Sequence, residues 1–146
     1  MDGLTSNAQL TNVNGVLYGT TSDGGIYGWG TVFSLNLTTA SAKTVYSFCN
    51  LYKSCVDGAR PVAGVINIKG VLYGTTGDGG PYLRGSIFSL NPTTGTEKIL
   101  YFFCSQTNCI DGAGPDASLI YYRGALYGTT VLGGSNNAGT VFKIIP

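Results

Sequence analysis

The sequence contains no histidine, and charged residues make up only 10% of its 146 positions. Without histidine, neither a Ser-His-Asp nor a Cys-His catalytic arrangement can be assembled. An average soluble domain carries roughly 25% charged residues, so this chain must cover its surface mainly with Ser, Thr, Asn, Gly and Tyr. We therefore expect a neutral, hydrogen-bonding surface and a function that is not enzymatic.

Clusters of basic residues and long apolar runs are lacking as well, and the formal net charge is only +1. Nucleic acids and anionic membranes are bound through concentrated basic fields, and a membrane-spanning helix needs ~20 consecutive apolar residues. The glycine-rich stretches contain no phosphate-binding motif of the Gly-x-x-x-x-Gly-Lys type. The sequence thus predicts no nucleic-acid partner, no membrane insertion and no cofactor.

What the sequence does contain is one motif repeated three times. Residues 15–21, 70–76 and 124–130 share the pattern Gly-(Val/Ala)-Leu-Tyr-Gly-Thr-Thr, and their leucines, at positions 17, 72 and 126, are 55 and 54 residues apart. Such a constant period indicates a repeat architecture. We divide the single domain, 1–146, into repeats at 2–56, 57–110 and 111–146.

Each repeat predicts a meander of short strands joined by glycine-rich turns, with no segment of helical periodicity. In the second repeat the predicted strands are 63–68, 71–76, 85–90 and 96–103. In the first they are 8–13, 16–21, 30–35 and 43–48, and the third contains only three, at 118–122, 125–130 and 139–144. The fold class is therefore all-β, built from tandem four-stranded antiparallel meanders.

Four strands per repeat of this length are typical of a β-propeller blade, and about three blades are too few to close a ring of 4–8. We expect closure by oligomerisation or within a longer array, hence a homo-oligomer, either a dimer or a polymer. In that arrangement the Leu-Tyr-Gly-Thr-Thr strand would be the innermost. The glycines inside it, Gly19, Gly74 and Gly128, predict close approach of another backbone or a ligand. A β-trefoil or β-prism is the alternative fold.

Four motifs in fixed order carry a family resemblance. They are Leu-Tyr-Gly-Thr-Thr, then Gly-Gly, then Gly-Thr-Val-Phe-x-Leu, then an aromatic strand ending in Phe-Cys-Ser-x-x-x-Cys before Asp-Gly, and Ser86 replaces the threonine found in the other repeats. The chain resembles the secreted bacterial tandem repeats called GloVer repeats, which occur in proteins with diverse surface-anchoring signals. The resemblance implies propeller-like β-structure and an extracellular or cell-surface location, and it supplies no catalytic residues.

The four cysteines form two local pairs, Cys49 with Cys55 and Cys104 with Cys109, at matched places in two repeats. This placement favours two small-loop disulfides and an oxidising compartment. Free thiols and a shared zinc site are the alternatives, although zinc sites usually space paired cysteines more closely. We predict no metal ion at these residues.

Six of the seven acidic residues are aspartates, and most of them precede glycine. Paired carboxylates can hydrolyse glycosides, but Asp-Gly is also ordinary turn chemistry in which the carboxylate accepts backbone N–H bonds. The periodic placement favours the turn. Asp23 and Asp78 could contribute to a calcium site, but the third repeat has Leu132 in their place.

The repeats differ most in the segment before their third strand. The candidate ligand-binding residues fall there: Tyr27, Trp29, Tyr82, Arg84, Asn136 and Asn137. Variable side chains on a fixed scaffold are typical of recognition surfaces. We predict a secreted binding or adhesion module for carbohydrate or a surface protein. The alternative is a structural unit that assembles into a ring or extracellular filament through exposed β edges.

Overall fold

The computed structural model describes residues 3–6, 8–50 and 55–146. Regular structure in this part of the chain is antiparallel β-sheet, apart from one short 3-10 helix, η1 (Thr107–Cys109). None of the described helical structure is long and apolar enough to cross a membrane. The predicted all-β class is confirmed, and none of the sheets closes on itself.

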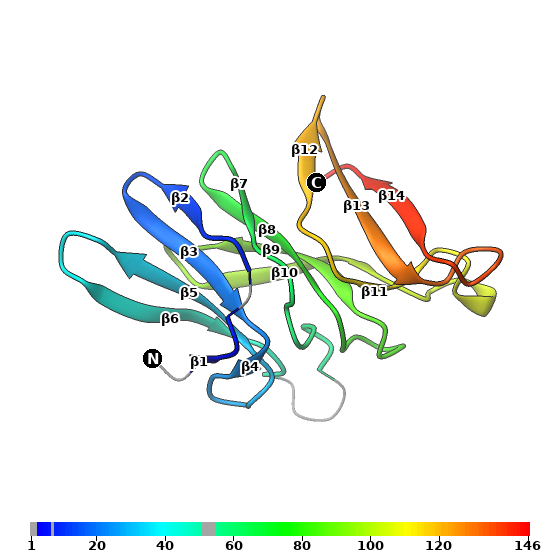
Figure 1. Cartoon of the computed structure of the whole chain (residues 1–146), viewed down its shortest axis with the longest axis horizontal. Helices are drawn as coiled ribbons and strands as arrows, with labels where there is room; N and C mark the ends of the chain where they lie inside the picture. Colours follow the sequence, from blue (N-terminus) through cyan, green and yellow to red (C-terminus); the bar gives the residue numbers. More distant parts are fainter. Residues whose placement is uncertain (1–2, 7, 51–54) are drawn as a thin grey trace.

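Three sheets follow one another along the chain (Figure 1). Sheet 1 has the strand order β2 (Thr11–Val13), β3 (Val16–Thr21), β5 (Thr31–Asn36) and β6 (Ser41–Ser47). Sheet 2 has the order β7 (Ile66–Ile68), β8 (Val71–Thr76), β9 (Ser86–Asn91) and β10 (Thr96–Phe102). In sheet 3, β13 (Ala125–Leu132) pairs with β14 (Thr140–Ile144) on one side and with β12 (Ile120–Tyr122) and β11 (Ala113–Pro115) on the other. A separate pair joins β1 (Gly3–Leu4) to β4 (Asp23–Gly24).

The predicted strands are present, with ends displaced by no more than three residues. The first strand of the second repeat is shorter than predicted because the residues before it connect neighbouring sheets. Thr20 Oγ1 donates to the Ala63 carbonyl at 2.9 Å, and Thr11 Oγ1 donates to the Val65 carbonyl. Those carbonyls accept bonds from sheet 1 instead of from a strand of their own sheet.

The Leu-Tyr-Gly-Thr-Thr strand is not the innermost strand of its sheet. β3 and β8 each lie second, and the short strands β2 and β7 form the edges that approach each other. The prediction of an innermost strand was wrong, because the strand predicted before the motif folds back onto it through a tight hairpin and takes the edge position. Asn67 and Ile68 of β7 pair with Leu72 and Val71.

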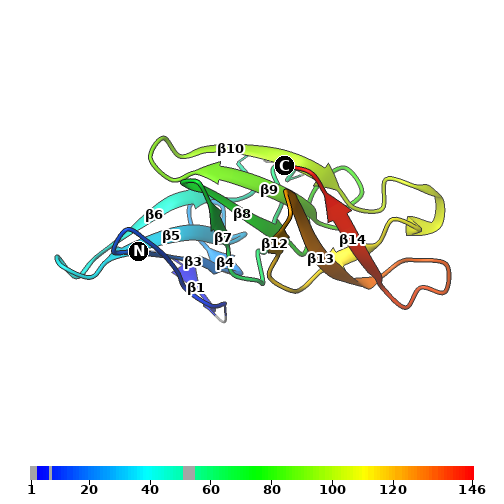
Figure 2. The same cartoon turned by 90° about the horizontal axis from the view of Figure 1, so that it is seen from above.

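Sheet 2 is packed between the other two sheets (Figure 2). Because side chains alternate between the faces of a strand, Phe88 and Leu90 face sheet 1, whereas Ile87 faces sheet 3. Each interface has an edge-on aromatic pair at its centre: Phe48 with Phe88, centroids 5.1 Å apart, and Phe103 with Phe142, centroids 5.0 Å apart. The chain therefore has two hydrophobic cores, one on each face of the central sheet.

In every sheet a hydroxyl pair joins the Leu-Tyr-Gly-Thr-Thr strand to the next long strand, and this pair is buried in sheets 1 and 2 and partly buried in sheet 3. The oxygen atoms of Thr21 and Thr31, of Thr76 and Ser86, and of Thr130 and Thr140 are each 2.8 Å apart. Serine at position 86 keeps this bond, which explains why the second repeat tolerates the change from threonine.

The glycines inside the Leu-Tyr-Gly-Thr-Thr strands make room for an aromatic ring of the adjacent strand. A Cβ atom on Gly74 would lie 2.7 Å from the ring of its cross-strand neighbour Phe88 and 3.1 Å from a methyl group of Val65. Gly19 faces Phe33 and Gly128 faces Phe142 in the same way. The prediction that another backbone or a ligand approaches these glycines was wrong, because aromatic rings of the adjacent strands fill the space beside them.

We expect Gly74→Ala to destabilise the fold by about 1–3 kcal/mol, because the added methyl group would overpack the core against Phe88. Urea unfolding followed by tryptophan fluorescence measures this loss. Gly77→Ala is the matched control, because its Cβ would meet no atom closer than 3.4 Å; it should change stability by no more than about 0.5 kcal/mol. Equal effects of the two substitutions would contradict the packing role of Gly74.

Candidate binding surface

The variable segments and the cysteine loops share one end of the sheets, which we call the loop end. It contains the connections from β3 to β5, from β8 to β9 and from β13 to β14, together with the chain that follows β6 and β10. The opposite end contains the tight hairpins, of which β2–β3, β7–β8 and β12–β13 point upward in Figure 1. All six candidate ligand-binding residues lie in connections at the loop end.

Both predicted disulfides are present, Cys49 with Cys55 and Cys104 with Cys109, and the structure contains no free cysteine. Neither a zinc site nor reactive thiols can use these side chains. Each disulfide closes a loop of only a few residues at the exit from the fourth strand. The two bonds therefore hold the loop end locally and do not tie distant parts of the chain together.

An aspartate accepts a backbone N–H bond from the residue that follows the first cysteine of each loop. Asp111 Oδ2 accepts bonds from Tyr101 Oη at 2.8 Å and from the backbone N–H of Ser105 at 2.9 Å, and Asp111 Oδ1 accepts from the N–H of Gln106. Burial opposes ionisation of this carboxyl, but the bonds from Tyr101, Ser105 and Gln106 outweigh it and lower the Asp111 pKa. The turn interpretation of these Asp-Gly pairs is confirmed for Asp111.

Asp57 occupies the equivalent place in the first cysteine loop and accepts bonds from Tyr46 Oη at 2.9 Å and from the Asn50 N–H at 3.0 Å. Here a second carboxyl approaches, Glu97 of β10. Burial and the negative charge of Asp57 raise the pKa of Glu97 to about 7. Asp57 Oδ1 and Glu97 Oε1 are both buried without a protein hydrogen-bond partner in the described chain. Glu97 therefore holds its proton near neutral pH, a feature that the sequence did not reveal.

The variable segments expose aromatic and polar side chains. Trp29 is 45% exposed and Tyr82 is 49% exposed. Tyr27 is less accessible because its hydroxyl donates to Asn50 Oδ1 at 2.7 Å. Asn137 has a structural role, since its Oδ1 accepts from the Gly133 N–H, whereas Asn136 is exposed. The six residues therefore form a row along the loop end and not one compact site.

The backbone of the first two variable segments is held by the following repeat. The Trp29 carbonyl accepts from the Arg60 N–H at 2.8 Å, and the Arg84 carbonyl accepts from the Gly114 N–H at 2.9 Å. These two bonds are equivalent in the repeat pattern. The side chains vary, but the position of each of these two segments is fixed.

Two hollows open beside the variable segments. Tyr27 lines one of about 380 Å³ together with Tyr46 and Asn50. Arg84 lines another of about 250 Å³, between sheets 2 and 3, whose other charged residues are Arg60, Asp78 and Asp116. Arg60 and Asp78 form a half-exposed ion pair with 3.6 Å between Nη1 and Oδ2.

We call the contact between sheets 1 and 2 the first junction and the contact between sheets 2 and 3 the second junction. The charged hollow lies at the second junction and has no charged counterpart at the first. The equivalent space between sheets 1 and 2 is only about 40 Å³ and is lined by neutral residues, with Thr5 in the place of Arg60 and Val62 in the place of Asp116. Sequence reasoning did not select Arg60 or Asp116. An alignment of the repeats could have revealed them, because each is charged where the preceding repeat has an uncharged residue.

In the described chain no three histidine, cysteine, aspartate or glutamate side chains gather as a metal site would require. The two aspartates considered for calcium are otherwise engaged, Asp78 with Arg60 and Asp23 with the Ser22 hydroxyl at 2.8 Å.

These features define an open, all-β tandem-repeat domain with a disulfide-braced loop end. A model of the Gloeobacter/Verrucomicrobia repeat matches residues 1–146, and the chain therefore belongs to that repeat family. The repeat family read from the motifs is confirmed, whereas the secretion and the propeller-like form that the resemblance implies remain predictions. No curated protein matches the sequence.

We expect Glu97→Gln to remove part of the pH dependence of stability. Between pH 4.5 and about 7 the folded protein holds the Glu97 proton, whereas the unfolded chain releases it. The contribution of Glu97 to stability is therefore fully present below pH 4.5 and is lost as the pH rises through 7. From pH 5 to pH 8 the wild type should lose about 1 kcal/mol more than the variant in urea unfolding, a value that allows for solvent screening. Asp116→Asn, at an exposed carboxyl, is the control, and a wild-type loss no larger than that of Glu97→Gln would contradict the prediction.

Proposed function

We propose that the chain is a secreted, non-enzymatic repeat module that binds a carbohydrate or a protein surface through its loop end. The observation that carries the proposal is the row of variable, exposed side chains, whose first two backbone segments are held in place by the following repeat. Recognition loops on rigid scaffolds have this organisation. The two disulfides support an oxidising compartment, and hence an extracellular location.

The chemistry of the loop end favours a carbohydrate. Exposed Trp29 and Tyr82 present flat apolar faces with a polar edge, a combination that suits stacking on a sugar ring. The charged hollow beside Arg84 offers two guanidinium groups and two carboxylates, which can donate to and accept from hydroxyl groups. A protein ligand would use the same aromatic and arginine side chains, which are the usual anchors of interfaces.

The stacking of the sheets supports a propeller-like arrangement, with each sheet as one blade. Neighbouring sheets pack face to face, and the edge strands β2 and β7 approach each other. Three such sheets cannot complete a ring. We propose closure or extension by further units of the same kind, from other chains or from a longer array.

A second candidate function is structural assembly, and it is favoured by the two outer faces of the stack. Val141 is 80% exposed on the outer face of sheet 3, whereas its equivalents Val32 and Ile87 are 0% and 1% exposed because the next sheet covers them. On the outer face of sheet 1, Leu10 is 47% exposed, whereas its equivalents Val65 and Leu119 are 2% exposed. The outer face of sheet 3 therefore matches the outer face of sheet 1 of a second copy.

This mode of assembly joins the faces of two sheets, whereas the sequence analysis predicts assembly through exposed β edges. Two different faces meet, so the contact is heterologous and can continue from copy to copy. The contact between sheets 1 and 2 also supplies a template for one polar contact, although the equivalent Thr75 hydroxyl between sheets 2 and 3 is unpaired in the described chain. Thr20, which bonds the Ala63 carbonyl, corresponds to exposed Thr129, and Ala63 corresponds to Ala8. The Thr129 hydroxyl would donate to the Ala8 carbonyl of the second copy.

For the binding function we expect Trp29→Ala and Arg84→Ala to weaken ligand affinity tenfold or more, as loss of an interface anchor does. A glycan array identifies the ligand, and titration calorimetry with that glycan measures the affinities. Tyr121→Ala is the control, because Tyr121 is 46% exposed but lies near the hairpin end. Absence of any array ligand, or an equal loss in the control, would contradict carbohydrate binding at the loop end.

For assembly we expect the mass in solution to rise with protein concentration in sedimentation velocity, and Leu10→Lys or Val141→Lys to stop the rise. Each variant keeps one intact outer face, so a mixture of the two should form pairs of chains even though neither associates alone. Thr39→Lys, on an exposed turn, should behave as the wild type. One-chain mass at all concentrations, or no recovery in the mixture, would contradict this mode of assembly.

A further inference from the structure

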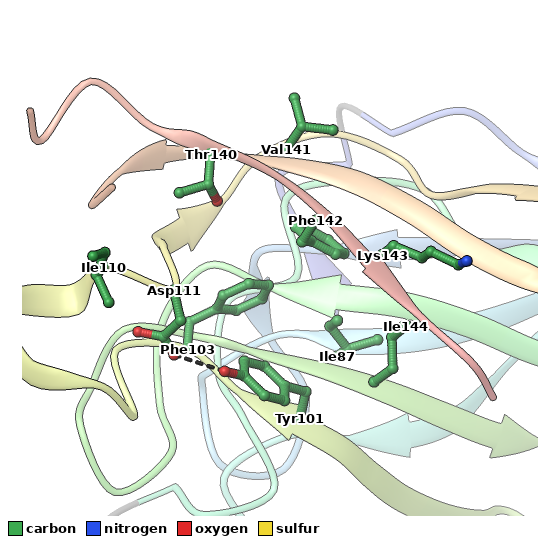
Figure 3. A pocket seen from close by; sticks show the side chains of 10 residues that line it. All are labelled: Ile87, Tyr101, Phe103, Ile110, Asp111, Thr140, Val141, Phe142, Lys143 and Ile144. Atoms are coloured by element: carbon green, nitrogen blue, oxygen red, sulfur yellow. Dashed lines mark hydrogen bonds between the residues drawn. The ribbon is translucent and has the colours of Figure 1, made fainter. Parts of the chain in front are cut away.

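An apolar groove of about 390 Å³ runs between β14 of sheet 3 and sheet 2 (Figure 3). Its walls are Phe142 and Ile144 on β14, Ile87 on β9, and Tyr101 and Phe103 on and after β10. Asp111 lies at one end and accepts the Tyr101 hydroxyl bond. The groove lies apart from the variable segments.

The same place between sheets 1 and 2 is filled by a strand. β10 pairs with β9 and directs Ile99 onto the core between sheets 1 and 2, with Ile99 opposite Phe88 and Glu97 opposite Leu90. Glu97 also approaches Asp57, the equivalent of Asp111. The fourth strand of sheet 2 thus closes the groove that sheet 2 forms with sheet 1.

In sheet 3 the corresponding positions are left partly open. Phe88 and Leu90 are both 0% exposed, whereas their equivalents on β14, Phe142 and Ile144, are only half-buried. Within the described residues β14 pairs with β13 alone. The other edge of β14 therefore presents a row of backbone N–H and C=O groups beside an apolar groove, which is the arrangement used in β-strand addition.

We propose that this groove is a binding site for an extended peptide strand with the pattern of the fourth strand. The occupant adds to β14 in the register that β10 adopts on β9, and a branched aliphatic residue opposite Phe142 enters the groove. An acidic residue lies opposite Ile144 and reaches toward Asp111, and a Tyr-x-Phe sequence completes the aromatic end. The second repeat itself supplies this pattern in residues 96–103, which are β10 and the Phe103 that follows it.

The groove differs at one position from its template, which is the pairing of β10 with β9. β9 has Ser89 opposite Lys98, but β14 has Lys143 at that place. Opposite charges directly across an antiparallel pair are stabilising, and like charges are destabilising. The strand that best fits β14 therefore carries an acidic residue where β10 has Lys98.

The test uses the full chain and a synthetic acetylated peptide with the sequence of residues 96–103, labelled for fluorescence anisotropy. We expect saturable binding, backbone amide shifts by NMR that centre on residues 140–144, and at least tenfold weaker binding when the peptide carries Ile99→Asp. The Lys98→Glu peptide should bind about two- to fivefold more tightly.

Two further peptides, N-methylated at alternate residues, test strand pairing itself. Methylation of the set that faces β14 should abolish binding, and methylation of the other set should leave most of it. Absence of saturation, equal loss from both sets, or shifts centred on the edge of β6 or β10 would overturn the proposal. The result is independent of ligand binding at the loop end, so failure of either leaves the other standing.

Discussion

The structure depends on the packing of sheet against sheet. A four-stranded meander of this size has two faces, and in sheet 2 both carry large apolar side chains because Phe88 and Ile87 point in opposite directions. Such a sheet cannot bury its side chains alone, and each face needs a neighbour. The edge-on pairs Phe48–Phe88 and Phe103–Phe142 are the centres of the two contacts. Stability therefore belongs to the interfaces between sheets more than to any one sheet.

This constraint explains several local choices in the sequence. The phenylalanine of each third strand lies flat across the second strand, which must then have glycine opposite it, as at Gly74. The threonine that follows is turned to the other face, where in sheet 1 it bonds the next repeat through Thr20 and Ala63. In sheet 2 the equivalent Thr75 hydroxyl is buried without a hydrogen-bond partner in the described chain, so only the glycine–phenylalanine packing is common to all three copies of the motif.

The sequence was sufficient for the local features and insufficient for those made across a junction. Alternation and glycine-rich turns located the strands, and the matched cysteine pairs predicted the disulfides, because these features depend on residues close together in the chain. The approach of Glu97 to Asp57 and the hollow lined by Arg60 and Asp116 depend on how two sheets stack. Only alignment of the repeats against one another would have marked these residues as departures. The binding residues remain predictions, since the structure shows their exposure and not their ligand.

The fourth strand shows that the packing unit differs from the sequence repeat. β10 belongs to sheet 2 by its hydrogen bonds, yet its Ile99 and Glu97 close the junction with sheet 1. A boundary drawn at Asp57 therefore divides one cooperative contact between two repeats. It follows that loss or gain of a fourth strand acts on the preceding junction as well as on its own sheet, so neighbouring repeats in such an array are coupled in stability. The groove beside β14 is the same junction without that strand. Its half-buried Phe142 and Ile144 show which side chains the strand would cover.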